Sequence, residues 1–170
     1  MAQDVAWLSP EQQVHWRAYL LGVARLNEAL NRQLERDSGL SLSEYEILVR
    51  LSEAEGRTLR MSDLALALMH SRSRLTHTVG RLESQGLVER RSCSDDRRGV
   101  NCTMTESGYD LLVRTAPGHV RAVREHLVDR LTEDELRALG RAMAKVAPGT
   151  PSPCDATEEA TPGRALVDAG

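Results

Sequence analysis

The longest pattern in the sequence is an apolar stripe with helical spacing. Its members are Trp16, Leu20, Val23, Leu26, Leu30 and Leu34. Ser9, Pro10 and Gln12 suit a helix start, because they supply an N-cap, a first-turn proline and a capping-box partner. The helix is predicted to run to about Asp37, with Gly39 as its stop. A helix of this length has more apolar surface than one small core covers, which favours packing on a partner.

A second helical pattern follows Gly39. Ser43 and Glu46 predict a capping box at its start, and Leu42 and Ile47 are spaced as a hydrophobic staple. The helix that they open is predicted to end at the next glycine, Gly56.

Two shorter helical patterns then lie on either side of a tight turn. Residues 62–69 form a compact apolar segment, and residues 71–85 form a second helix that Gly86 stops. A short helix, a tight turn and a second helix with polar outward positions have the layout of a helix-turn-helix.

Alternating polar and apolar residues predict a β-hairpin after this second helix. Residues 87–91 and 100–104 form its two arms, and the tip between them carries Arg97 and Arg98. Arginines at such a tip stay in water, and a hairpin beside a helix-turn-helix can reach a minor groove, where arginine is favoured. Phosphate would repel Asp96, so we expect this side chain to hold an arginine or to cap the turn.

Two further helices and a tail complete the predicted organisation. Thr105 caps a helix that is predicted to reach about Leu131, with a kink at Pro117. Another capping box precedes the last helix, which is predicted to end near Ala147. Residues 148–170 are rich in proline, threonine, alanine and acids, which predicts a disordered acidic tail. The predicted fold class is therefore mainly α with a small β wing, an α+β arrangement.

The net charge of −3 is unevenly distributed along the chain. Residues 57–105 carry nine basic and five acidic side chains, a net charge of +4, whereas residues 1–56 carry −4. A basic region in an otherwise acidic chain predicts an anionic partner that contacts one face, and a solvated charged surface is the alternative.

The helix predicted at residues 71–85 has two different faces. Leu75, Val79 and Leu82 share one side at 100° per residue. The remaining surface carries hydroxyl, imidazole and guanidinium groups and a bare glycine, contributed by Ser73, Arg74, Thr76, His77, Gly80, Arg81 and Ser84. Small donors with no acid before Glu83 suit a major groove, and Ser71 with the first-turn N–H groups favours a phosphate. The alternative is an ordinary surface helix.

The segment from residue 62 to residue 108 resembles the winged helix-turn-helix of the MarR family of bacterial transcriptional regulators. Residues 96–100 (DRRGV), followed by Met104-Thr105-Glu106 and Gly108, are similar to the family's wing pattern D-x-R-x-x-x-x-x-L-T, with methionine in place of the usual leucine. The stretch GRLESQGLVERR also resembles the family's entry to the wing. The resemblance extends from about Trp16 to Ala147.

The resemblance implies a homodimer that binds a pseudo-palindromic operator in double-stranded DNA. A MarR-type domain at 9–147 would comprise dimerisation helices at about 9–38 and 106–147 and a winged helix-turn-helix at about 43–105. Arg98 would enter the minor groove with Asp96 as its orienting partner, and Arg97 would contact the DNA backbone. The DNA-binding residues are then expected to be Ser71, Arg72, Ser73, Arg74, Thr76, His77, Arg81, Arg97 and Arg98.

The resemblance also implies a switch, commonly a small aromatic or anionic effector that releases DNA. Trp16, Tyr19 and Tyr45 could line its pocket, or could serve core and interface packing. A redox switch at Cys93 and Cys102 is the alternative, because nearby arginines could lower a thiol pKa.

Other function classes are not supported by the sequence. A nucleophile paired with a base and a glycine-rich phosphate loop are both lacking, so we expect no enzyme and no cofactor. His119 and His126, like His70 and His77, are seven residues apart but have no clear further ligand, so we expect no metal. The three cysteines and the lack of a secretory signal or long apolar run predict a cytoplasmic protein.

Three alternatives stay open within this interpretation. The chain could be a winged-helix module that binds a protein rather than specific DNA. It could activate rather than repress transcription, although a repressor is the function we expect. The acidic tail, with a net charge of −3 over residues 149–170, could also compete with DNA for the wing arginines.

Overall fold

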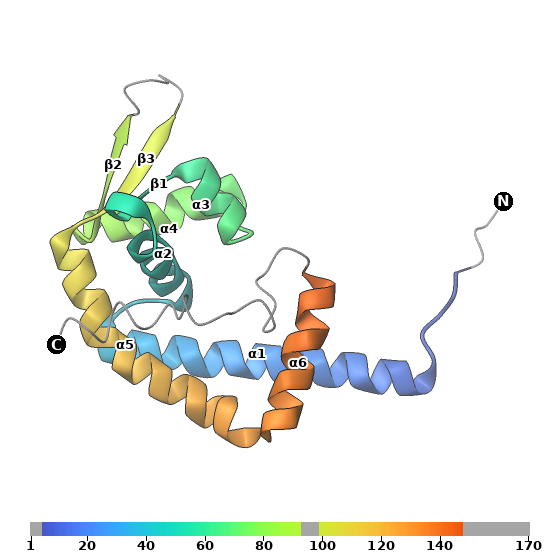
Figure 1. The fold of residues 1–170 in the computed structure, drawn as a ribbon. Helices are drawn as coiled ribbons and strands as arrows, with labels where there is room; N and C mark the ends of the chain where they lie inside the picture. Colours follow the sequence, from blue (N-terminus) through green and yellow to red (C-terminus); the bar gives the residue numbers. More distant parts are fainter. Residues whose placement is uncertain (1–4, 93–98, 148–170) are drawn as a thin grey trace.

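The computed structural model describes residues 5–92 and 99–147 (Figure 1). The helices in these ranges are α1 (Pro10–Ser38), α2 (Leu42–Ser52), α3 (Met61–Ala67), α4 (Arg72–Ser84), α5 (Glu106–His126) and α6 (Glu133–Val146). The strands are β1 (Thr58–Arg60), β2 (Val88–Ser92) and β3 (Val100–Met104). The expected mainly helical fold with a small β wing is confirmed.

Two long helices form the base of the molecule. Figure 1 shows α1 and α5 packed along each other, with α2, α3, α4 and the sheet gathered as a lobe over one end of the pair. The other end of α1 projects beyond this lobe. The predicted cap of α1 is confirmed, since Ser9 and Gln12 form a capping box and Gly39 ends the helix in the left-handed conformation at φ 71°.

The three strands form an antiparallel sheet in the order β1-β3-β2. The β2–β3 hairpin (the wing) pairs Val88 with Met104 at its base and Ser92 with Val100 near its tip. β1 was not predicted, because three residues are too few for an alternating pattern to be visible. The side-chain hydroxyls of Thr58 and Thr103 lie 2.9 Å apart and join this short strand to β3.

One hydrophobic core connects the lobe to the long helices. Leucines from α1, α2, α3, α4 and α5 meet in it, and the residues that are almost or fully inaccessible include Leu34, Ile47, Leu48, Leu51, Leu64, Leu75, Val79, Leu82 and Leu112. The predicted inner face of α4 is therefore confirmed. Because Leu75, Val79 and Leu82 are buried, the opposite face of α4 points away from the core.

The start and end of α2 differ from the prediction. Ser41 and Glu44, rather than Ser43 and Glu46, form the capping box. Both serine–glutamate pairs have the required spacing, but the earlier start places Leu40 in the core and directs the Glu44 side chain towards α4. The helix ends at Ser52 rather than at the glycine, because a 3-10 turn at Glu55–Arg57 follows it and contains that glycine.

The C-terminal helices follow the predicted order with one earlier end. α5 continues through Pro117 but ends at His126 rather than near Leu131, because a 3-10 turn at Val128–Arg130 interrupts it. The predicted capping box of α6 is confirmed at Thr132 and Glu135. The predicted disordered tail at 148–170 lies outside the described residues.

Candidate nucleic-acid interface

The N-terminus of α4 is an exposed, capped helix start. Ser71 is the N-cap, and its hydroxyl accepts a hydrogen bond from the Arg74 backbone N–H at 3.3 Å. The Ser73 hydroxyl lies 3.2 Å from the Ser71 hydroxyl. The first turn contains no acidic residue, so the partial positive charge of the helix start is not neutralised locally. This geometry suits an anion such as a DNA phosphate.

The outward face of α4 is polar. Arg72, Ser73, Thr76 and His77 are exposed, whereas Thr78 is buried and donates a hydrogen bond to the Arg74 carbonyl at 3.0 Å. The exposed surface therefore presents hydroxyl, imidazole and guanidinium groups together. These groups are hydrogen-bond donors of the kind that read base edges in a major groove.

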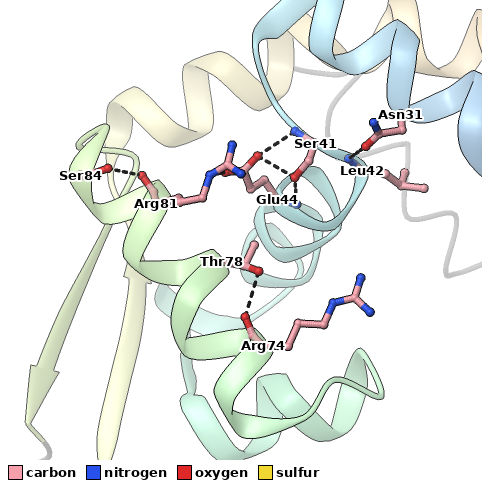
Figure 2. A network of polar contacts seen from close by, with 8 residues as sticks. All are labelled: Asn31, Ser41, Leu42, Glu44, Arg74, Thr78, Arg81 and Ser84. Carbon is pink, nitrogen blue, oxygen red and sulfur yellow. Dashed lines mark hydrogen bonds and ion pairs between the residues drawn. The ribbon is translucent and has the colours of Figure 1, made fainter.

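The two arginines on the flank of α4 contact α2. The Arg74 guanidinium donates a hydrogen bond to the Ser43 hydroxyl at 3.0 Å. The Arg81 Nε lies 3.1 Å from Oε1 of Glu44, whose side chain is 0% exposed (Figure 2). Both arginines were predicted as DNA contacts from the sequence, which could not reveal these partners on another helix. Each of them has a partner within the chain.

The two arginines on strand β2 of the wing are also paired. Arg90 forms an ion pair with Glu83 of α4, and Arg91 forms one with Glu89 at 2.6 Å. The hydrogen bond from the Arg90 side chain lowers the pKa of Glu83. The predicted tip residues Asp96, Arg97 and Arg98 lie outside the described residues, and so does Cys93.

An open, mainly apolar cavity of about 870 Å³ lies where α1, α2 and α5 meet. Leu30, Val49, Val113 and Val120 are among its lining residues, together with Tyr45 and His119. The Tyr45 and His119 rings are 4.5 Å apart, and His119 Nδ1 lies 3.3 Å from the Gln33 amide oxygen. Burial lowers the pKa of His119 and raises the pKa of Tyr45, so both side chains are neutral near pH 7.

The three aromatic residues considered for an effector pocket do not lie in one cavity of the folded single chain. Tyr45 lines the cavity, but Trp16 and Tyr19 are not among its lining residues. These two rings stack on each other at 5.9 Å on the exposed N-terminal half of α1. His119, which sequence reasoning considered only as a metal ligand, is the second ring beside Tyr45. A histidine on an otherwise apolar helix face was the available signal for it.

Cys102 lacks the properties of a redox switch. It lies on β3 with its side chain fully buried, and burial raises its pKa from an ordinary value of 9.0 to about 11. A reactive cysteine needs an accessible thiolate, which requires a lowered pKa. The redox alternative therefore receives no support from Cys102. Within the described ranges, no three His, Cys, Asp or Glu side chains are grouped as metal ligands.

The raised pKa of Cys102 predicts a loss of stability at alkaline pH. The unfolded chain releases the thiol proton near pH 9 and the folded chain only near pH 11, so the free energy of unfolding falls as pH rises between these values. We expect Cys102 to contribute a loss of about 2–3 kcal/mol over this range. Chemical denaturation at pH 8, 9, 10 and 11 should show a steeper decline for the native protein than for Cys102→Ala. An equal decline of the free energy of unfolding with pH in both proteins would contradict the raised pKa of Cys102.

Comparison with known proteins places these features in a family. The model of the MarR family matches residues 38–99. The transcriptional regulator PecS of Dickeya dadantii is 32% identical over 124 residues, which is 69% of this chain and 74% of PecS. The transcriptional repressor MprA of Escherichia coli K12 is 31% identical over 94 residues, and the match covers 55% of this chain and only 53% of MprA.

A solved structure extends the similarity to most of the chain. The MarR family transcriptional regulator Sco3205 from Streptomyces coelicolor, in complex with DNA, is 45% identical with a TM-score of 0.83. The superposition covers 86% of this chain and 92% of that protein.

None of the helices in the described ranges is both long and apolar enough to span a bilayer.

Proposed function

The chain belongs to the MarR family of transcriptional regulators, and from this premise we propose that it is a homodimeric repressor that binds a pseudo-palindromic operator and is released by a small-molecule ligand. As a transcriptional regulator it is not an enzyme. The observation that carries the proposal is the exposed face of α4, where hydroxyl, imidazole and guanidinium groups occur with no acid in the first turn. The similar regulator Sco3205 has been solved in complex with DNA, which supports DNA as the partner.

The proposed DNA contacts come from two segments of the chain, α4 and residues 96–98. Ser71 and the first-turn N–H groups of α4 bind a phosphate, while Arg72, Ser73, Thr76 and His77 face the major groove. The resemblance of residues 96–100 to the wing pattern of the family supports the proposal that Arg97 contacts the backbone and that Arg98 enters the minor groove, with Asp96 as its orienting partner. Arg74 and Arg81 lie beside the α4 face and contact α2.

Dimerisation is supported by the distribution of exposure along the apolar stripe of α1. Leu30 and Leu34 are buried and Leu26 is half-buried, but Trp16, Leu20 and Val23 are exposed on the single chain. α6 also has no buried residue, although its sequence is amphipathic. We propose that a second copy covers both surfaces, so that α1, α5 and α6 form a dimerisation unit and residues 43–105 form the DNA-binding lobe.

The cavity beside Tyr45 is the proposed site of the effector. Its position between the long helices α1 and α5 and the lobe helix α2 means that a ligand there contacts both proposed units. The Tyr45 and His119 rings suit an aromatic ligand. Arg50 at the cavity pairs with Glu53 at 3.2 Å, and an anionic group of the ligand can replace this carboxylate as its partner. A ligand that favours one orientation of the lobe over another then lowers DNA affinity.

Replacing Arg72 by alanine tests the assignment of α4. Arg72 is exposed at the first position of the helix, so its removal should weaken binding to a selected duplex by between about 5-fold and 100-fold. If Arg72 contacts a phosphate, the slope of log Kd against log salt falls by about one, and if it contacts a base, selectivity at one position relaxes. Fluorescence anisotropy at several salt concentrations measures both quantities.

The matched control is Arg114→Ala, which removes the same charge from an exposed position on α5. We expect wild-type affinity for this variant. If both variants bind DNA as tightly as the wild type, the α4 face does not read DNA, and the protein-interaction alternative becomes the better explanation.

A further inference from the structure

A set of polar contacts joins three helices behind the proposed DNA-binding face (Figure 2). On the α1 side, the Asn31 amide oxygen accepts a hydrogen bond from the Leu42 backbone N–H at 2.9 Å. At the start of α2, Ser41 donates to Glu44 Oε2 from its backbone N–H at 2.7 Å and from its hydroxyl at 2.6 Å. On the α4 side, Oε1 of the same carboxylate lies 3.1 Å from Arg81 Nε.

The burial of Glu44 makes its pairing with Arg81 consequential. The Glu44 side chain is 0% exposed, whereas that of Arg81 is 55% exposed. A buried carboxylate is costly unless hydrogen bonds and a counter-charge compensate for its lost hydration. Ser41 satisfies Oε2, but Oε1 accepts no hydrogen bond within the described residues and has the Arg81 guanidinium as its ion-pair partner. Moving Arg81 away would leave this charge without compensation.

The negative charge of Glu44 is not needed for its role in capping α2. A capping box works equally with glutamine at this position, because only an oxygen that accepts from the N-cap N–H is required. What the carboxylate adds over an amide is electrostatic attraction for Arg81. The charge therefore acts between α2 and α4 rather than within α2.

A second contact acts with this pair to define the orientation of α4. Arg74 and Arg81 are seven residues apart, so they lie on the same side of the helix two turns from each other. Arg74 contacts Ser43 near the start of α4, and Arg81 contacts Glu44 near its end. Two contacts to one neighbouring helix restrict rotation of α4 about its axis, which determines where Arg72, Ser73 and His77 point.

We propose that Glu44 is a positioning residue for DNA binding, and that Arg81 serves this contact rather than a DNA phosphate. The inference rests on the proposed function, because it assigns how α4 is held for DNA. Glu44 holds Arg81 against α2 and thereby orients the exposed face of α4. The Asn31 contact continues the same connection to α1.

Four variants and a selected duplex test this proposal. Glu44→Gln keeps the capping oxygen and the side-chain shape but removes the charge, and Arg81→Gln removes the partner. The double variant completes a double-mutant cycle. Glu28→Gln is the matched control, because it removes an exposed carboxylate that pairs with Arg32 within α1. The dissociation constant is measured at several salt concentrations, well below the melting temperature of each variant, with a duplex recovered from a random-sequence pool by the wild type.

We expect Glu44→Gln and Arg81→Gln each to weaken binding about tenfold, with the double variant no weaker than Arg81→Gln. The salt slope should stay equal to that of the wild type in all of them, because no phosphate contact is lost. Glu28→Gln should bind as the wild type does. Wild-type affinity for Glu44→Gln would overturn the proposal. A slope of log Kd against log salt that is reduced by about one in Arg81→Gln would also overturn it, because that result identifies a phosphate contact.

A measurement without DNA separates this proposal from the proposed function. In Glu44→Gln, hydrogen exchange of the α4 amides should become about tenfold faster, while that of the α6 amides stays unchanged. If the wild type selects no duplex, the proposed function fails, and this exchange result alone decides whether Glu44 holds α4. Unchanged exchange in α4 would overturn the positioning role.

Discussion

Replacing Leu20 by aspartate should convert the protein to a monomer and reduce its DNA affinity at least about 100-fold. Leu20 is 47% exposed on the single chain and lies between Trp16 and Val23 on the stripe that Leu30 and Leu34 continue into the core. An unpaired carboxylate buried in the proposed dimer interface costs several kcal/mol, whereas in a monomer it faces water. Loss of the dimer also separates the two half-site contacts, which removes their cooperation. Sedimentation and anisotropy with a selected duplex measure the two effects.

The control for this variant is Arg25→Asp, which places the same side chain on α1 about opposite to the stripe. We expect it to remain dimeric and to bind DNA. The secondary structure of Leu20→Asp, followed by circular dichroism, should stay close to that of the wild type, because the single chain does not bury this position. A Leu20→Asp variant that remains dimeric would contradict the proposed interface.

Replacing Gly108 by alanine should destabilise the protein by about 3 kcal/mol. A Cβ built at this position, in the first turn of α5, would lie 2.2 Å from the Leu87 carbonyl oxygen. That oxygen also accepts a hydrogen bond from the Thr105 N–H at 3.1 Å, so it cannot move without loosening the junction between the wing and α5. The glycine is therefore required for close approach of two backbones. Equilibrium denaturation in urea measures the change in the free energy of unfolding.

Gly80→Ala is the control for Gly108→Ala, because a Cβ at Gly80 of α4 meets nothing within 4 Å. Alanine is a better helix former than glycine, so this variant should gain up to about 1 kcal/mol. The two substitutions are chemically identical and should have opposite signs. A Gly108→Ala variant as stable as the wild type would show that the Leu87 backbone adapts, contrary to our interpretation.

The features that could be predicted from the sequence are those that depend on local patterns. Helical spacing identified both faces of α4, and three capping signals located the starts of α1, α5 and α6 correctly. Alternation in residues 87–91 and 100–104 identified the wing. These signals are local because a helix or hairpin satisfies most of its backbone hydrogen bonds within itself.

The features that could not be predicted depend on contacts between distant segments. Two serine–glutamate pairs qualified as the cap of α2, and the pair that forms it, Ser41 and Glu44, has its carboxylate beside Arg81 on a helix more than thirty residues away. Burial of Cys102 depends on how the sheet packs, so its thiol could not be distinguished from a reactive one. The separation of Trp16 and Tyr19 from the Tyr45 cavity likewise depends on the direction of α1 across the molecule.

We propose that a dimer of this chain reads a specific DNA sequence through α4. The most direct measurement is selection of bound duplexes from a random-sequence pool by the purified, reduced protein. We expect enrichment of an inverted repeat whose half-site centres lie about 10 base pairs apart. Binding that falls with rising salt but enriches no sequence would contradict it, because the basic surface would then attract DNA without reading it.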